Sequence, residues 1–271
     1  MKVKTIVSGI VLAVFAFFIL LPIYWLVVES VKPLGEAIGI ATLFPKKFSL
    51  EGWIEGLIKE GFLEFIKNSL IISLGGVAVN IVVGLLAAYA FSRYTFKGDN
   101  HLFFWLLTNR MAPAAAFALP YYMIYTSLQL YDTYHGLILC HTIFNLPFAI
   151  WLLKGFIDAI PRELDEAAEL DGYSFWSYMT KILIPMIKSG IAVTAFFVFI
   201  FSWSEFLFAT ILTHLSAMPL THALFRLFWR STTSPWNTVA AMTILSMIPG
   251  LVFLFFGERY IVRGLTFGAV R

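Results

Sequence analysis

The sequence predicts an all-α integral membrane protein, and two observations lead to this fold class. The chain of 271 residues is 60% hydrophobic and only 13% charged, with a mean hydropathy of +0.84. A soluble domain carries roughly 25% charged residues, so this chain has too little polar surface to enclose a water-soluble core. It also contains six apolar runs long enough for a helix to cross about 30 Å of hydrocarbon. A soluble enzyme, a nucleic-acid binder and a disordered protein are therefore excluded.

The six predicted transmembrane helices form a single domain over residues 1–271. The first run is longer than the apolar core of a signal peptide and no cleavage-site pattern follows it, so we expect it to be retained as a span. In the second run, Gly76 and Gly84 with Asn80 between them put small and polar groups on one face, which predicts close helix packing. The runs lie at about 6–28, 68–91, 103–127, 136–157, 190–212 and 238–258.

The distribution of basic residues predicts the orientation. With a cytoplasmic N-terminus, eleven of the 19 Lys and Arg residues fall on the cytoplasmic side, seven fall outside, and Arg110 lies within a run. Because cytoplasmic loops carry the excess of Lys and Arg, both termini are predicted to be cytoplasmic. The single cysteine, Cys140, cannot form an internal disulfide, so stability has to come from helices that pack in the lipid bilayer.

Two external loops carry amphipathic stretches. In the loop over 30–66, apolar residues recur at helical spacing between Ile54 and Ile66. This pattern favours a helix that lies at the membrane surface or caps the bundle, rather than a binding site. In the loop over 213–237, a similar apolar stripe lies beside Trp229 and Trp236. This second stripe is either an interfacial anchor or a contact for a partner that delivers substrate.

The segment 158–185 is too charged to enter lipid. Six acidic residues and one basic residue lie between Asp158 and Asp171. Pro161 is placed as a first helical residue, Gly172 lies just past the last one, and Ser174 caps a second short helix. The residues by themselves leave two alternatives open: a helix that docks into a groove of a separate cytoplasmic protein, or a solvated helical hairpin.

Polar residues within the runs are the candidates for a translocation path, because ionisable groups at membrane depth usually face a cavity or a partner. Glu205 and Arg110 have further alternatives: they pair with each other, or they link to a second subunit. For Glu205 a bundle-stabilising role is favoured over contact with a substrate. The candidates are Asn109, Arg110, Asn145, Ser202, Ser204 and Glu205.

A spaced motif in the acidic segment resembles the EAA loop of the membrane subunits of bacterial ATP-binding-cassette (ABC) importers. The motif consists of Glu166, Ala167, Ala168, Gly172, Ile182 and Pro185. Ile184 stands where the family has Leu before the proline, a change that keeps the bulk and the apolar character. Residues 201–208 resemble the fifth-span signature of the sugar-type permeases, and 258–271 resemble the ending of one of the two permeases in maltose-type importers.

This resemblance implies the six-span, type I importer (MetI-like) fold and a permease subunit in a bacterial inner membrane. It implies a second homologous permease, two ATP-binding subunits that hydrolyse ATP with Mg²⁺, and an external solute-binding protein that delivers a sugar, polyol or related solute. The EAA residues would receive the movement of the ATPase subunits. The C-terminal residues that would reach toward the ATPase are Arg263, Gly264, Leu265 and Thr266.

Two other classes of function remain as alternatives. The chain has no phosphate-binding loop and no dipeptide Gly-Lys, so it is not expected to hydrolyse ATP or to bind a cofactor itself. A six-span channel or facilitator that works without an ATPase would need a filter or a pore-lining repeat, and neither is visible in the sequence. A membrane-embedded enzyme would have to use the five His residues, but these form no close metal-ligand motif, and His141 beside Cys140 is interpreted as a packed helix position.

Overall fold

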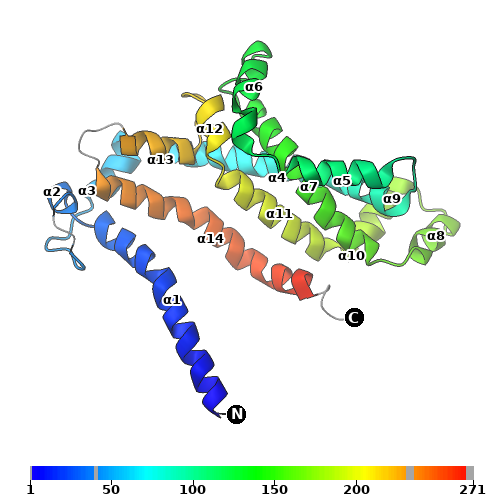
Figure 1. Ribbon diagram of the computed structural model, residues 1–271, viewed down its shortest axis with the longest axis horizontal. Helices are drawn as coiled ribbons and strands as arrows, with labels where there is room; N and C mark the ends of the chain where they lie inside the picture. The colour runs from blue at the N-terminus through cyan, green and yellow to red at the C-terminus, as the bar shows by residue number, and fades with distance from the viewer. Residues whose placement is uncertain (1, 40–41, 230–234, 267–271) are drawn as a thin grey trace. The chain divides into compact units, whose positions relative to one another are not determined.

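The computed structural model describes residues 2–39, 42–229 and 235–266, with side chains for 7–39, 42–229, 235–255 and 257–258. Throughout these ranges the regular structure is helical, and they contain no strand (Figure 1). The elements are α1 (Lys2–Ser30), α2 (Leu34–Ala37), α3 (Glu51–Ile54), the π-helix η1 (Glu55–Lys59), α4 (Phe62–Arg93), α5 (Asp99–Asn109), α6 (Ala114–Ser127), α7 (Tyr134–Asp158), α8 (Glu163–Leu170), α9 (Phe175–Tyr178), the π-helix η2 (Met179–Leu183), α10 (Ile184–Met186), α11 (Lys188–Trp203), α12 (Leu207–Leu212), α13 (Leu220–Trp229) and α14 (Trp236–Thr266).

Within the part of the chain that the structure describes, four helices are each long and apolar enough to cross a membrane, namely parts or all of α1, α4, α7 and α14. Two bent pairs bring the number to six if each pair forms one span: α5 with α6, bent by 93°, and the helical stretch 175–186 with α11, bent by 80°. The all-helical membrane fold class is therefore confirmed, but two of the expected spans are not straight helices.

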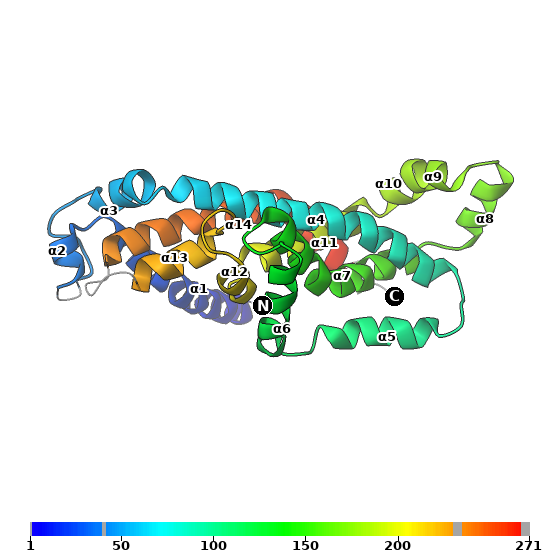
Figure 2. The ribbon, with the colours of Figure 1, turned by 90° about the horizontal axis from the view of Figure 1, so that it is seen from above.

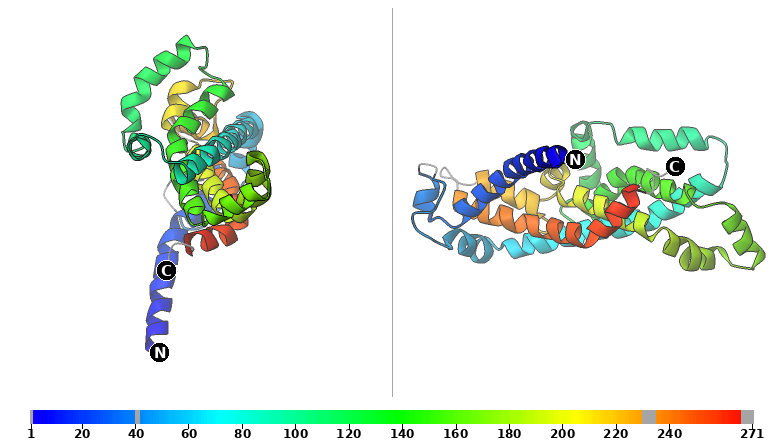
Figure 3. Two further views of the ribbon diagram at one scale, coloured as in Figure 1. Left: turned by 90° about the vertical axis from the view of Figure 1, so that its right-hand side faces the viewer. Right: turned by 90° about the horizontal axis from the view of Figure 1, so that it is seen from below.

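The third predicted run, 103–127, is corrected to two helices. α5 ends at Asn109 and α6 begins at Ala114, and Figures 2 and 3 show the two helices nearly at right angles. Pro113 precedes α6 with an extended backbone (φ −64°, ψ 119°), so the helix cannot continue through it. At 1.5 Å per residue the 11 residues of α5 and the 14 of α6 are each too short to cross about 30 Å of hydrocarbon alone.

The fifth predicted run, 190–212, is also interrupted. α11 ends at Trp203 and α12 begins at Leu207, with Ser204, Glu205 and Phe206 between them outside any helix. Non-helical backbone at membrane depth is tolerated where protein or a water-filled cavity surrounds it.

The chain divides into two compact units, of which the first comprises residues 1–66 and 222–249. The predicted amphipathic stretch, Ile54 to Ile66, is not one helix, because it runs from the end of α3 through η1 into the first turns of α4. α3 and η1 pack against the start of α14. A Cβ atom on Gly52 would lie 2.6 Å from the carbonyl carbon of Asn237, and one on Gly56 would meet the side chain of Met242. These contacts hold α3 and η1 against the first turns of α14.

The second unit comprises residues 67–221 and 250–271 and is built around α7. α5, α11 and α12 pack against α7, and α4 approaches it through glycines. A Cβ atom on Gly84 would lie 3.3 Å from Cβ of Ala149. Asn80 is fully buried and donates to the Gly76 carbonyl oxygen at 2.8 Å. The predicted close packing of this glycine face is thus confirmed.

Candidate functional site

The acidic loop (residues 158–185) contains the short helix α8 outside the membrane-spanning helices. α8 begins at Glu163 rather than at Pro161, and it ends at Leu170 with Asp171 as its C-cap. Gly172 has φ +79°, the left-handed conformation that glycine adopts without strain, and open space surrounds it. The Ser174 hydroxyl accepts a hydrogen bond from the Ser177 N–H at 3.4 Å and caps α9, as predicted.

Arg93, at the end of α4, attaches α8 to the membrane-spanning helices. Its Nε atom lies 2.7 Å from Oδ2 of Asp165, and its Nη2 atom donates to the Ile160 carbonyl oxygen at 3.0 Å. The side chains of Arg93 and Asp165 are only 7% and 18% exposed. A second contact comes from Arg162, which donates to the Ser92 carbonyl oxygen at 2.9 Å. The acidic loop is therefore fixed to α4 at both sides of the α8 start.

The motif residues of α8 divide between two faces. Ala168 is only 4% exposed and packs in a core with Leu153 of α7 and Leu183 of η2. Glu166 and Ala167 are exposed, and Leu170 is exposed by 89%. Exposed aromatic side chains continue this outer face just beyond Gly172: Tyr173, Phe175 and Trp176. One face of α8 thus holds the loop in place, while the other presents a carboxylate beside apolar side chains.

Pro185 lies in a distorted part of the chain. The preceding residues, Met179–Leu183, form a π-helix, and the direction changes by 80° near Ile187, before α11 begins. A proline lacks the N–H that a regular helix would use, which accounts for the irregular hydrogen bonding around it. Ile182 packs against the core beneath α8.

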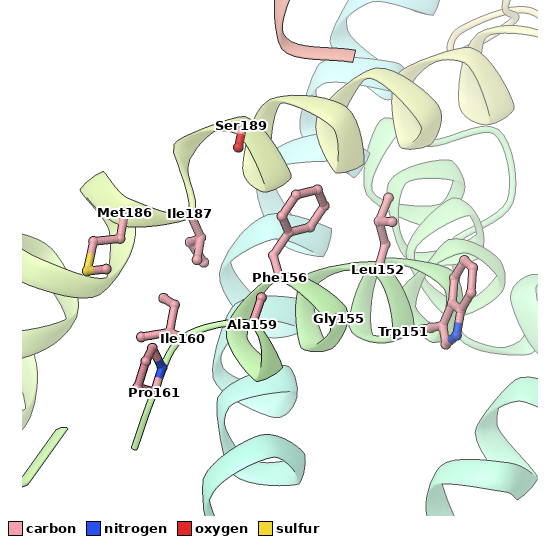
Figure 4. Close-up of a pocket in the computed structure, with 10 residues that line it drawn as sticks. All are labelled: Trp151, Leu152, Gly155, Phe156, Ala159, Ile160, Pro161, Met186, Ile187 and Ser189. Atoms are coloured by element: carbon pink, nitrogen blue, oxygen red, sulfur yellow. The ribbon is translucent and has the colours of Figure 1, made fainter. Parts of the chain in front are cut away.

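An apolar hollow of about 750 Å³ adjoins this bend (Figure 4). It lies between the last turns of α7 and the α10–α11 junction, and its walls include Trp151, Phe156 and Met186. Such walls offer few groups for a polar solute, because a binding site for such a solute needs placed hydrogen-bonding groups. The hollow is therefore a feature of the bend rather than the candidate path.

Arg110 lies at the break between α5 and α6. Its Nη1 atom donates to the Phe144 carbonyl oxygen at 3.0 Å and to Oδ1 of Asn145 at 3.3 Å. The guanidinium carbon lies 5.1 Å and 4.4 Å from the ring centres of Phe148 and Phe201. Within the described side chains, no carboxylate pairs with this cation. Neutral groups therefore hold the charge, through carbonyl dipoles and aromatic faces.

A smaller hollow of about 200 Å³ opens beside Arg110. Trp105, Asn109, Tyr121 and Phe144 contribute to its walls. Asn145 continues the polar contacts inward, because its Nδ2 atom donates to the Ser202 hydroxyl at 3.2 Å. The structure thus brings together four of the six predicted path residues, counting Asn109, Arg110, Asn145 and Ser202.

Glu205 and Ser204 are held elsewhere. The Glu205 carboxylate accepts the N–H groups of Phe208 at 2.8 Å and Ala209 at 2.9 Å, which caps the start of α12. It lies 3.7 Å from Nε2 of His141, so its neighbour is this histidine and not Arg110. The hydroxyl of Ser204, the C-cap of α11, donates to the carbonyl oxygen of Ile200 in the last turn of that helix at 2.7 Å. These contacts favour the bundle-stabilising role for Glu205.

Sequence reasoning missed the anchoring groups of the acidic loop and one carboxylate outside the membrane. In the sequence, Arg93 is only one of the eleven basic residues on the predicted cytoplasmic side. Asp132 accepts four backbone N–H groups of a distant loop, and no sequence signal announces backbone donors. The four predicted C-terminal contact residues belong to the last turns of α14, but their side chains are outside the described residues.

Comparisons with known proteins agree with this arrangement. Residues 80–267 match the family described as binding-protein-dependent transport system inner membrane component. A probable ABC transporter permease of Sinorhizobium fredii is 36% identical over 95% of this chain and 92% of its own length. The trehalose transport system permease SugB of Mycobacterium tuberculosis is 33% identical over 93% of this chain and 92% of its own length.

A solved structure has the same fold. It is a bacterial ABC transporter involved in the import of the acidic polysaccharide alginate, with a TM-score of 0.81 at 20% identity, and the match covers 96% of each chain. A helical membrane subunit with a short helix attached outside its spans is thus the class to which this chain belongs. In particular, the chain belongs to the binding-protein-dependent inner-membrane transport components, and it is a permease subunit of an ABC importer rather than an enzyme.

Proposed function

We propose that this permease couples the ATPase subunits of its importer to alternating access through helix α8. The observation that carries the proposal is the two-sided arrangement of α8: Ala168 and Asp165 bind it to the membrane-spanning helices, while Glu166 and Leu170 face outward. An amphipathic helix of this kind suits docking into a groove of another protein. A carboxylate at its surface can accept charge-assisted hydrogen bonds from a basic residue in that groove.

The remaining partners follow from the same proposal. A second permease would complete the translocation path, two ATP-binding subunits would hydrolyse ATP with Mg²⁺, and an external solute-binding protein would deliver the cargo. Residues 263–266 would approach the ATPase subunits. The chain would lie in the bacterial inner membrane with both termini in the cytoplasm. A channel that works without an ATPase is not favoured, because the relatives are permeases of ABC transporters.

Replacing Glu166 by Gln tests the coupling. We expect uptake per ATP hydrolysed to fall at least tenfold in the assembled transporter in proteoliposomes, while insertion and folding are unchanged because the side chain is exposed. Glu163→Gln is the matched control, since Glu163 is an exposed carboxylate in the first turn of the same helix. Wild-type coupling in Glu166→Gln, or an equal loss in both variants, would contradict the role assigned to Glu166.

We also propose that the hollow beside Arg110 forms part of the path for a sugar or related solute. The aromatic walls offer faces for a sugar ring, and Nη1 alone makes the hydrogen bonds of Arg110 to described residues, which leaves its other nitrogens as donors. A related permease transports trehalose, which makes labelled trehalose and maltose the first cargoes to try.

Arg110→Gln tests this path. We expect the apparent KM for uptake to rise several-fold without loss of basal ATPase activity. Ser204→Ala is the control, because the Ser204 hydroxyl is already satisfied by the carbonyl oxygen of Ile200 at the end of α11. Equal KM values for Arg110→Gln and the wild type would remove Arg110 from the path.

A further inference from the structure

Asp132 holds a distant loop of the second unit by its backbone. Its Oδ1 atom accepts the N–H groups of His214 at 3.0 Å and Ala217 at 3.1 Å. Its Oδ2 atom accepts those of Leu215 at 3.2 Å and Ser216 at 2.9 Å. The Asp132 N–H in turn donates to the carbonyl oxygen of Leu212. Four consecutive N–H groups that converge on one carboxylate form a concave anion site, here filled by the chain's own side chain.

The backbone of Asp132 is adapted to this arrangement. Its φ of +56° is uncommon for a residue with a side chain, although Asp and Asn adopt it more readily than most. Burial alone would raise the pKa of this carboxyl, but the four N–H donors outweigh it and hold the pKa at about 2, below the ordinary 3.8. Asp132 is therefore ionised at any physiological pH, and the contact is permanently charge-assisted.

Residues in the first turns of α4 hold the same loop and the residue that follows it. The Asn68 amide donates to the carbonyl oxygens of Met218 at 2.9 Å and Ser216 at 3.4 Å, and it accepts from the Tyr134 hydroxyl at 2.7 Å. The Ser69 hydroxyl accepts the N–H of Leu220 at 2.8 Å. The loop 213–219 is thus bound to α4 and to the turn before α7, and Tyr134 of α7 holds the Asn68 amide that binds the loop.

The residues just after the loop 213–219 also contact the break in the fifth run. The Thr221 hydroxyl donates to the carbonyl oxygen of Glu205, the residue that caps α12. Residues 205–221 are therefore held at both ends, and the buried second half of the loop, residues 217–219, anchors it in the protein. Its other half carries Leu215, which is 61% exposed.

We propose that Asp132 is a positioning residue for the outward end of this permease: it fixes the loop 213–219, with α12 and the starts of α4 and α7, as one rigid body that the external solute-binding protein meets. The proposal rests on the proposed function. α11 ends at Trp203, so the break at 204–206 separates this outer body from the long part of the fifth run. Movement between α11 and α12 would then leave the docking surface undistorted.

The experiment uses the assembled transporter with Asp132→Asn, which keeps the tolerance for positive φ but offers an N–H group where an acceptor is needed. Hydrogen exchange should be about fivefold to tenfold faster at the amides of 214–217, because bonds to a charged acceptor are lost. The solute-binding protein is then titrated without added solute. Its concentration at half-maximal stimulation of the ATPase (half-stimulation) should rise at least tenfold. The basal ATPase rate should not change. Asp99→Asn is the control, because among the described residues Asp99 accepts a hydrogen bond only from the neighbouring Asn100 N–H.

Three results would overturn the proposal. The first is hydrogen exchange at 214–217 that does not change in Asp132→Asn. The second is faster exchange there with the same half-stimulating concentration of binding protein. The third is a lower maximal ATPase rate with no shift in that concentration. If Asp132→Asn fails to fold, Asn68→Ala, which removes the bonds to Ser216 and Met218, must shift half-stimulation in the same direction. A wild-type complex that the binding protein does not stimulate would instead contradict the proposed function.

Discussion

Removing the carboxylate of Asp165 tests whether α8 is mechanically attached to α4. The ion pair with Arg93 is short, at 2.7 Å, and both side chains are largely shielded from water, with 7% and 18% exposure. Arg93 keeps a second contact, to the Ile160 carbonyl oxygen, when Asp165 is replaced by Asn. The variant therefore removes the ion pair between α4 and α8 and leaves the other contacts of the acidic loop in place.

The structure sets the expected size of the effect. Two charges about 4 Å apart attract by about 4 kcal/mol at the effective dielectric constant near a protein surface, and desolvation removes part of this gain. Removing one partner of a buried pair costs about 3–5 kcal/mol. Since Asp165 retains some exposure and Arg93 keeps one contact, we expect about 2–3 kcal/mol for Asp165→Asn. A similar loss of stability is expected for Arg93→Gln. The double variant should be destabilised by about 1–2 kcal/mol less than the sum of the two single variants.

Cys140 provides the assay. It is the only cysteine and is completely buried, so its rate of alkylation, followed by mass spectrometry of this chain in the purified complex, reports opening of the second unit. Coupling of ATP hydrolysis to uptake is measured in the same preparations and should fall in both single variants. If the two substitutions are additive within about 0.5 kcal/mol, the ion pair does not act as a link and the reasoning fails.

Two further predictions concern α8 and Asp132. Ala168→Leu should destabilise the chain by about 1–3 kcal/mol through overpacking of its buried face. Ala167→Leu, on the exposed face, should change stability by less than about 0.5 kcal/mol but reduce coupling. Faster alkylation of Cys140 in Ala167→Leu than in Ala168→Leu would contradict the assigned faces. Because the pKa of Asp132 is lowered to about 2 from 3.8, its stabilising contribution is complete above about pH 3.8 and is lost as the pH falls toward 2. After allowance for solvent screening this contribution is about 1 kcal/mol, so the melting temperatures of wild type and Asp132→Asn should converge over that range; a constant difference would refute the charge assignment.

The helical membrane fold could be predicted because the bilayer imposes a simple rule on composition and length. The bends could not be predicted in the same way. A hydropathy average over about 20 residues is hardly changed by a single residue such as Pro113 or Glu205. A proline also permits a bend without fixing its angle. The 93° between α5 and α6 and the break before α12 depend on the packing of both around α7, which is a tertiary property.

The acidic loop shows the same division. Gly172 and Ser174 act locally, through a backbone angle and a cap, so the end of α8 and the start of α9 were visible in the sequence. The pairing of Arg93 with Asp165 joins residues far apart in the chain, and many other acidic residues were available as partners. The donors to Asp132 are backbone groups, which every residue except proline possesses, so their convergence leaves no trace in residue identity.

The two ionisable groups within the predicted runs differ in what the protein already provides for them. Glu205 accepts two N–H groups of α12 and has His141 beside it, so its carboxylate is accounted for within the chain. Arg110 rests on two aromatic rings and two neutral oxygens, beside a hollow, and no described carboxylate pairs with it. A charged group at membrane depth that is paired and hydrogen-bonded within the chain stabilises the fold. A charged group that has no partner of opposite charge can still bind another molecule. This difference, rather than charge itself, makes Arg110 the stronger candidate for contact with the transported solute.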